Sequence, residues 1–274
     1  MGVGSRVADL FDESVAPSST WYCDKPTCDG KPHRGWDHNH ARVAQRPPAA
    51  FVAGEARVWV MMAGRGFGKT RAGAEWIAHE ARSTPNSEWA VVAPTFDAVK
   101  RVCFGEDGDA GILTALGMRR SDDRYNKSSG LIRLDNDAVI VGYSAEAPTA
   151  GRGPNLYGLW ADEIAQWSSS EMYDNLFPAL RKGRAQTVVT TTPAPVPLLL
   201  QFTSRDDGSV VTSGGSTFDN AENLTPSAVA DLELRWSGTR KEKQELYGLL
   251  LEDVPGALWS AAKIESTRAV LLPD

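Results

Sequence analysis

A glycine-rich stretch between an apolar run and a helical segment constrains this chain more than any other feature. The sequence "VWVMMAGRGFGKTRAGAEW" spans residues 58–76. Gly68, Lys69 and Thr70 fit the phosphate-loop pattern G-x-x-x-x-G-K-[ST], but Ala63 stands at the first glycine position. An alanine costs little there if its φ is negative. We therefore predict a buried strand, a loop that cradles phosphates and a helix that begins near Lys69.

The side chains of this loop predict a nucleoside triphosphate site. Lys69 would reach the β- and γ-phosphates of ATP, and the Thr70 hydroxyl would hold Mg²⁺. The alternative is a glycine-rich turn between a strand and a helix with no ligand. The intact Gly-Lys-Thr triplet after an apolar strand favours the nucleotide site. The residues predicted to contact nucleotide are Gly64, Arg65, Gly66, Phe67, Gly68, Lys69, Thr70 and Arg71.

Short apolar runs alternate with segments of helical composition along the rest of the chain. Runs of this kind, bounded by Gly, Pro or charged residues, are typical of buried parallel strands. The alternation predicts an α/β fold with a central, mostly parallel sheet and helices on both faces. Residues 131–144, which turn at Asp135-Asn136-Asp137, predict an inserted β-hairpin. The other predicted strands are 57–63, 88–94, 156–162, 186–192 and 208–213, and the predicted helices are 69–82, 95–104, 168–182 and 226–250.

A second apolar strand, in "LYGLWADEIAQW", ends in the acidic pair Asp162 and Glu163. Asp162 would hold Mg²⁺ through water, and Glu163 would orient and deprotonate the water that attacks the γ-phosphate. An acidic pair here can also cap the helix that follows. Its distance downstream of the phosphate loop favours hydrolysis.

The run Thr190-Thr191-Thr192 ends another apolar strand, "VVTTTPAP". Hydroxyls at this position would sense the γ-phosphate. The alternative is a strand end rich in β-branched residues before a proline stop.

Cysteine and histidine residues cluster near the N-terminus in "WYCDKPTCDGKPHRGWDHNHAR". Sulfur and nitrogen ligands this close together suggest a tetrahedral Zn²⁺ site formed by Cys23, Cys28, His33 and either His38 or His40. The spacing is looser than in common zinc motifs, so a reduced, solvated arm is the alternative.

Composition excludes several classes of protein. The 274 residues carry a formal net charge of −6, the wrong sign for a protein that coats nucleic acid over its whole surface. No apolar stretch is long enough to cross a membrane and no secretory signal is present, which predicts a cytoplasmic protein without a membrane partner. Two basic clusters are candidate contacts to DNA phosphates or ordinary solvated surface: Arg119, Arg120 and Arg124, and Arg181, Lys182 and Arg184.

Taken together, the motifs resemble the ATPase domain of phage large terminase subunits, the motors that package DNA into proheads. "AGRGFGKTRAGAEW" is similar to the family's deviant Walker A loop, which contains an arginine. "GRGPNLYGLWADEIAQW" is similar to its Walker B region, "VVTTTPAP" to its coupling motif and "PGALW" to its exit from the ATPase domain. The resemblance covers about residues 45–265 and implies an ASCE-type P-loop NTPase fold.

The resemblance also implies roles for individual residues. Arg65 would contact phosphate and respond to hydrolysis. Arg152 matches a proposed arginine finger that enters the neighbouring subunit's site, although it is otherwise a loop cation between Gly151 and Gly153. Gln45 matches the place of an adenine-contacting glutamine, and Thr190, Thr191 and Thr192 would couple hydrolysis to movement.

The expected function is ATP hydrolysis that drives double-stranded viral DNA into a prohead in the host cytoplasm. The expected partners are DNA, the portal of the prohead, the small terminase subunit and further copies in a ring. We expect an arm or small appendage over residues 1–50, the ATPase domain over 51–255 and a linker over 256–274. The family's nuclease carboxylates lie beyond Asp274, so no DNA cleavage is expected. The rivals are a helicase-like DNA-dependent ATPase and a non-catalytic nucleotide-binding adaptor.

Overall fold

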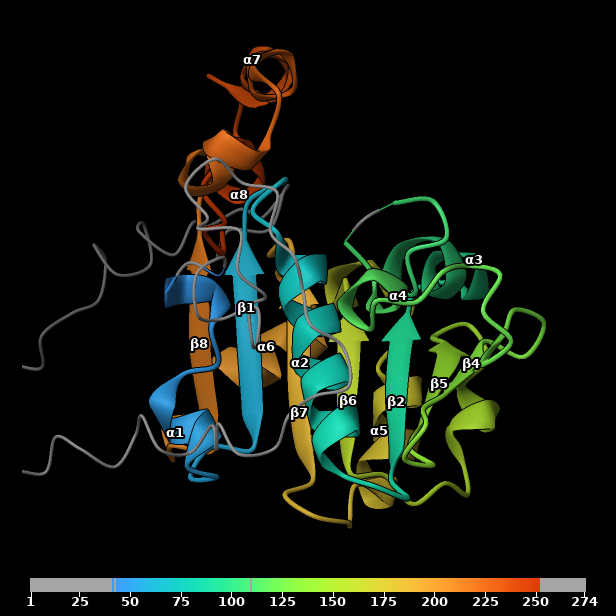
Figure 1. The fold of residues 1–274 in the computed structure, drawn as a ribbon. Helices are drawn as coiled ribbons and strands as arrows, with labels where there is room; N and C mark the ends of the chain where they lie inside the picture. Colours follow the sequence, from blue (N-terminus) through green and yellow to red (C-terminus); the bar gives the residue numbers. More distant parts are fainter. Residues whose placement is uncertain (1–40, 42, 109, 252–274) are drawn as a thin grey trace, which may run out of the picture.

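One mixed β-sheet organises the protein in the computed structural model, which describes residues 41, 43–108 and 110–251. Within these residues, eight strands lie in the order β3-β4-β5-β2-β6-β7-β1-β8 (Figure 1). Many strands that are neighbours in the sheet are not consecutive in the sequence, so several connections cross over other strands. The strands are β1 Val58–Ala63, β2 Glu88–Ala93, β3 Tyr125–Asn126, β4 Leu131–Arg133, β5 Val139–Ser144, β6 Gly158–Asp162, β7 Gln186–Thr191 and β8 Val210–Gly215.

The six strands from β5 to β8 in this order are parallel, so their carboxyl ends share one edge of the sheet. The central parallel strands β1, β2 and β6 are buried on both faces, which explains why their sequences are almost continuously apolar, whereas burial alternates along β5 and β8 is only partly buried. The five strands predicted from apolar runs are confirmed. Their shared edge positions the phosphate loop after β1, the acidic pair after β6 and the threonine run at the end of β7.

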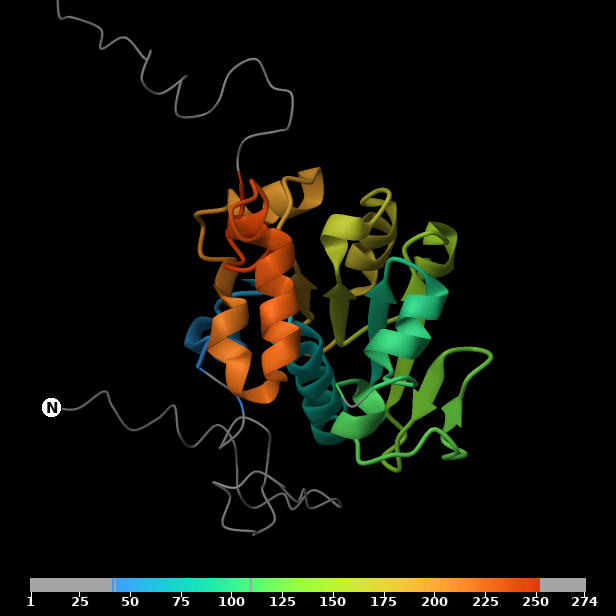
Figure 2. The same ribbon diagram turned by 90° about the horizontal axis from the view of Figure 1, so that it is seen from above.

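Helices cover both faces of the sheet. Trp59 and Met61 of β1 pack in the core on the side of α2 (Lys69–Ser83), whereas Val58 and Val60 pack on the opposite side. That opposite side is covered by α5 (Glu171–Leu176) and α6 (Pro197–Thr203). Viewed from above, α2 in teal lies across the sheet from α5 and α6 in yellow and gold (Figure 2). The predicted layer arrangement is confirmed.

The remaining helices are short. Among the residues that the structure describes, α7 (Pro226–Trp236) and α8 (Glu242–Glu245) follow β8, and α7 extends beyond the carboxyl edge of the sheet (Figure 1). The α-helices are α1 Ala49–Val52, α3 Phe96–Ala98, α4 Ile112–Ala115, α7 Pro226–Trp236 and α8 Glu242–Glu245, and a π-helix, η3, spans Val99–Cys103. The 3-10 helices are η2 Val43–Gln45, η4 Pro148–Gly151, η5 Ile164–Gln166, η6 Phe177–Ala179 and η7 Thr217–Asn223.

Two helix predictions are too long. The single helix predicted over 226–250 is wrong, because Ser237 is extended and Gly238 has a φ of 72°, which separates α7 from α8. The helix predicted over 168–182 is reduced to α5 and the 3-10 helix η6. Pro178 in that segment lacks the N–H that would continue an α-helical ladder.

The predicted hairpin is present, with Asp137 at a φ of 63° in its turn. It is not a separate insertion, because β5 pairs in parallel with β2 and antiparallel with β4. The hairpin therefore forms one edge of the central sheet, extended by β3. At the opposite edge of the sheet, the N-terminal segment of the described residues contacts β8, where the Ser213 hydroxyl donates to the Ala44 carbonyl. In the part of the chain that the structure describes, no helix is long and apolar enough to cross a membrane.

Candidate nucleotide-binding and hydrolysis site

The loop between β1 and α2 has the backbone of a phosphate cradle. Gly66 and Gly68 adopt φ values of 72° and 99°, which side chains other than hydrogen strongly disfavour. Ala63 ends β1 and is not among the residues with positive φ, so the alanine at the first glycine position is accommodated without strain. Gly64 has a different reason to be glycine, since a Cβ there would lie 2.3 Å from the Leu246 carbonyl oxygen.

Three successive loop carbonyls point to the outside of the loop, where side chains bind them. In a trans peptide the following N–H points the opposite way, so the N–H groups of Gly66 and Gly68 face the inside. Within the described residues, no hydrogen bond occupies these two N–H groups or those of Lys69 and Thr70. Inward N–H groups at a helix N-terminus form an anion site. The outer bonds are Thr217 Oγ1 to the Arg65 carbonyl (2.7 Å), Asn220 Nδ2 to Gly66 (2.5 Å) and Gln45 Nε2 to Phe67 (2.7 Å).

Lys69 is buried beneath this loop. Its ammonium donates to the carbonyls of Ala63 (2.9 Å) and Gly64 (3.0 Å) and to the Thr192 hydroxyl (3.1 Å). Burial lowers the pKa of Lys69, and the nearby carboxylates of Glu163 and Asp162 oppose that shift. The side chain is therefore held between the phosphate loop and the two carboxylates, where a lysine can contact both a phosphate and the threonine run.

Asp162 ends β6 and is almost completely buried. One carboxylate oxygen accepts from Thr190 Oγ1 at 2.6 Å, and the other from Cys103 Sγ at 3.6 Å. Burial, reinforced by the Glu163 carboxylate, raises the pKa of Asp162. Each oxygen retains a lone pair for a further ligand, and carboxylate oxygen is what Mg²⁺ prefers.

Glu163 adopts a φ of 48°, a left-handed backbone that is rare for a non-glycine residue and clusters at functional sites. Its backbone N–H donates to the Thr190 carbonyl at 2.6 Å. Its Oε2 atom accepts from the Thr192 N–H at 3.1 Å. The turn directs the carboxylate towards the end of β7 and away from the neighbouring Asp162 hydrogen bonds. This arrangement leaves Glu163 able to accept a proton from a bound water.

The threonine run contacts both motifs. Thr190 bonds Asp162, and Thr192 bonds Lys69 and Glu163. Thr191 accepts from the Ala165 N–H at 3.2 Å, which fixes the turn after the acidic pair. All three threonines are buried. The run is therefore more than a strand end of high β-propensity, because each hydroxyl has a specific partner near the site.

Arg65 lies at the tip of the phosphate loop and pairs with Glu245 of α8, with Nε 2.6 Å from Oε2. The arginine side chain is half exposed and the glutamate is buried. The Arg65 N–H also donates to the Glu245 carbonyl at 2.8 Å. The segment after α7 thus lies against the loop. Sequence reasoning missed Glu245 along with Thr217 and Asn220, and no local motif in the sequence marks them.

Arg152 lies away from this site. Its Nε donates to Asn175 of α5 at 3.3 Å, and it lines an open cleft of about 300 Å³ with Asp174 and Arg181. Arg152 follows η4 in the connection between the end of β5 and the start of β6, whereas Asp162 and Glu163 stand at the opposite end of β6. Among the described residues, no interaction joins the exposed Arg152 guanidinium to Lys69 or Glu163.

Gln45 is buried against the phosphate loop through the Phe67 carbonyl, so it supports the loop backbone. The predicted zinc ligands Cys23, Cys28, His33, His38 and His40 lie outside the described residues, as does the predicted linker. Among the residues that are described, no cluster of three or more His, Cys, Asp or Glu side chains is arranged to hold a metal. Mg²⁺ in nucleotide sites needs no such cluster, because it takes one or two protein oxygens and completes its shell with phosphates and water.

Comparisons with known proteins bear on both the sequence and the fold. The family model described as "Terminase large subunit, T4likevirus-type, N-terminal" matches residues 60–266. The solved ATPase domain of the Thermus phage P74-26 large terminase is 17% identical, with a TM-score of 0.54 over 79% of this chain and 92% of that one. No curated protein matches.

Two structures of the large terminase from a thermophilic bacteriophage are similar as well. The ADP complex is 14% identical, with a TM-score of 0.56 over 71% of this chain and 48% of that one. The ATP-γ-S complex is 15% identical, with a TM-score of 0.53 over 70% and 47%. This chain therefore spans about half the length of that second phage's protein. At these identities the likeness shows the fold, which is that of a P-loop NTPase.

Proposed function

Since this chain belongs to the family of T4-like large terminase subunits, matching its N-terminal region, we propose that it hydrolyses ATP to drive double-stranded viral DNA into a prohead. The observation that carries the proposal is the chain of contacts from Lys69 through Thr192 to Glu163. These contacts support the proposal because they connect the lysine that would bind phosphate to the glutamate that would act as general base. An adaptor that only bound nucleotide would not need this glutamate.

The residues divide the chemistry among them. The loop N–H groups and Lys69 bind the β- and γ-phosphates, and Thr70 and Asp162 hold Mg²⁺. A Mg²⁺ ion held by these two residues would supply neutralisation of the charge that develops on the phosphates. Glu163 orients water and takes its proton, a role worth about 10²–10⁴ in rate. No covalent intermediate with the protein is required, because water attacks the γ-phosphorus directly and ADP leaves.

Three further groups would transmit and complete hydrolysis. Arg65 and the threonine run lie next to the phosphate loop and respond to loss of the γ-phosphate. Arg152 enters the site of a neighbouring copy, a role supported by its exposure and by the absence, among the described residues, of any interaction between it and Lys69 or Glu163 of its own chain. A finger supplied across an interface makes turnover depend on assembly into a ring. DNA, the portal of the prohead and the small terminase subunit are the proposed partners, in the host cytoplasm.

A packaging assay tests the function against its rivals. Purified chain, proheads, linear double-stranded DNA and Mg-ATP are combined, and DNA protected from added nuclease is measured. The proposal predicts ATP-dependent protection that is lost in Glu163→Gln and retained in Glu171→Gln, an acidic residue in the first turn of α5. DNA-stimulated turnover with strand separation and no protection would favour a helicase. Protection that persists in Glu163→Gln would favour a non-catalytic adaptor.

A further inference from the structure

Trp160 lies two residues before Asp162 on β6, and its indole is fully buried. Its Nε1–H donates to Thr190 Oγ1 at 2.7 Å, and Thr190 Oγ1 donates to Asp162 Oδ1 at 2.6 Å. In the sheet, Asp162 stands directly beside Thr190, and Trp160 beside Val188. The three side chains thus form one relay from the core to the carboxylate.

The chemistry of the groups fixes the direction of this relay. An indole nitrogen can only donate a hydrogen bond, whereas a threonine hydroxyl carries one proton and accepts through its lone pairs. Thr190 must therefore accept from Trp160, and its single proton is directed to Asp162. Without the indole N–H, the hydroxyl could rotate and bond elsewhere. The Trp160 indole thus determines the direction in which the Thr190 hydroxyl donates its proton.

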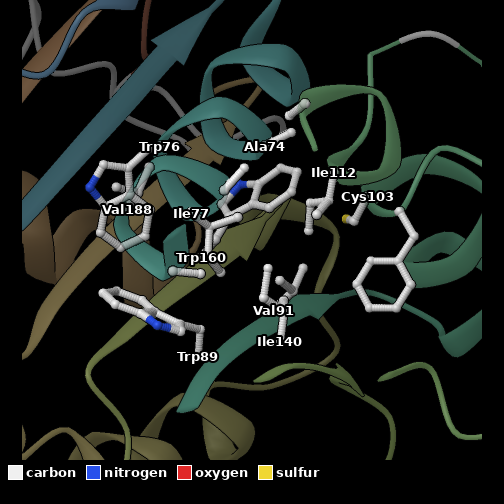
Figure 3. Close-up of a cluster of buried hydrophobic side chains, with 14 of the residues drawn as sticks. Ala74, Trp76, Ile77, Trp89, Val91, Cys103, Ile112, Ile140, Trp160 and Val188 are labelled. Carbon is white, nitrogen blue, oxygen red and sulfur yellow. The ribbon is translucent and has the colours of Figure 1, made fainter. Parts of the chain in front are cut away.

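The indole itself is fixed by the helix that follows the phosphate loop. A Cβ on Gly73 of α2 would lie 2.2 Å from Trp160 Cε2, so only glycine at this position admits the ring. Figure 3 shows Trp160 beneath α2 in the same cluster as Ile77 and Cys103. Cys103 in turn donates to the second oxygen of Asp162. The Asp162 carboxylate is therefore oriented by two groups from one apolar cluster.

We propose that Trp160 is a positioning residue for the magnesium-binding carboxylate, holding Asp162 through the Thr190 hydroxyl in the rotamer that binds Mg²⁺. The inference rests on the proposed function. It assigns to a core tryptophan a role in metal affinity that packing alone would not require. A residue that serves packing alone would change the stability of the fold and leave the Mg²⁺ requirement unchanged.

Trp89 provides a matched control. It belongs to the same cluster, is only 3% exposed and donates from Nε1 to the Ser87 hydroxyl at 2.7 Å. Trp160→Phe and Trp89→Phe therefore remove the same atoms and the same kind of hydrogen bond from similar surroundings. Only the first of these bonds leads to Asp162. Replacing Trp160 by 3-benzothienylalanine adds a variant that retains the ring outline, lacks the N–H and leaves no cavity.

The experiment measures binding rather than turnover. Calorimetry follows the non-hydrolysable analogue AMPPNP binding to the purified chain at a series of Mg²⁺ concentrations, and again in EDTA. Loss of one hydrogen bond predicts that Trp160→Phe and the benzothienyl variant need about tenfold more Mg²⁺ for half-maximal binding. Trp89→Phe should resemble wild type, and metal-free binding should be the same in all. Thr190→Val should reproduce the shift, and adding Trp160→Phe to it should add little, because both act through one relay.

The outcomes separate the inference from the function on which it rests. Equal Mg²⁺ requirements in the Trp160 and Trp89 variants would overturn the positioning role while leaving nucleotide binding intact. An additive double variant would also overturn it. Absence of AMPPNP binding by the wild-type chain under all conditions would contradict the proposed function and the positioning role together.

Discussion

Lys69 and Thr192 are separated by 123 residues in the chain, yet the lysine ammonium donates to the threonine hydroxyl at 3.1 Å. The N–H of the same threonine donates to the Glu163 carboxylate. Thr192 therefore contacts both the Lys69 ammonium and the carboxylate of Glu163, the proposed general base. Under the proposed function, this contact assigns the end of β7 a part in hydrolysis.

Replacing Thr192 by valine tests this connection. Valine keeps the shape and the backbone N–H but removes the acceptor of the Lys69 ammonium. We expect kcat for ATP to fall about tenfold, the equivalent of one hydrogen bond, with little change in KM. Steady-state phosphate release measures both constants. Thr212→Val, at an exposed position of β8, is the control and should match wild type. Equal kinetics in the two variants would contradict the connection.

Alanine substitutions at two glycines with positive φ distinguish a requirement for the geometry of the phosphate loop from a general loss of stability. Gly68→Ala and Gly208→Ala each force an alanine into the left-handed region, at a cost of about 1–2 kcal/mol in the free energy of unfolding. A Cβ at Gly208 meets nothing, whereas at Gly68 it would lie 2.5 Å from Gln45 Nε2. Urea unfolding should show a loss at both positions, larger at Gly68 because of the contact with Gln45, but only Gly68→Ala should abolish nucleotide binding. Retained binding in Gly68→Ala would mean that phosphates do not use this loop.

The ion pair between Arg65 and Glu245 holds α8 on the phosphate loop. Arg65→Ala leaves a buried carboxylate without its cation, which we expect to cost about 1–2 kcal/mol, a value reduced because half of the arginine is exposed to solvent. Arg101→Ala is the control, because both of its acidic partners are exposed and its loss should leave the free energy of unfolding nearly unchanged. Chemical denaturation measures both. Equal losses would show that α8 is not held by this pair.

Arg152 should act only in assembled rings. Arg152→Ala is expected to bind nucleotide normally and to lose at least about 10³-fold in assembly-dependent turnover. Mixed with Glu163→Gln subunits, it should regain activity, because its intact base receives a finger from the neighbour. Arg181→Ala, from the same cleft, is the matched control and should retain turnover. Mixed rings that stay inactive would exclude a finger supplied in trans.

The motifs could be predicted from sequence because each is local. The phosphate loop and the acidic pair lie within a few residues of a strand end, and a parallel sheet brings such ends to one edge. The strand runs were recognisable for the same reason, as buried parallel strands are apolar on both faces. The helix over 226–250 was overestimated because Gly238 takes a left-handed backbone that helical composition does not reveal.

The contacts that orient the site could not be predicted in this way. Arg65 and Glu245 are 180 residues apart, and Trp160 reaches Asp162 through a residue of another strand. Such pairings depend on the order of strands in the sheet, which apolar runs do not encode. In the sequence, Trp160 is simply one more apolar residue of a buried strand. Its hydrogen bond to Thr190 becomes apparent only in the folded protein, where β6 and β7 are neighbours.

The most direct test of the account is ATP turnover and nucleotide binding measured side by side for wild type and Glu163→Gln. The variant keeps the shape of the side chain and removes its basicity. We predict that it binds ATP with unchanged affinity and that kcat falls at least about a hundredfold. Turnover equal to that of wild type, with binding intact, would contradict the claim that Glu163 activates water in this site.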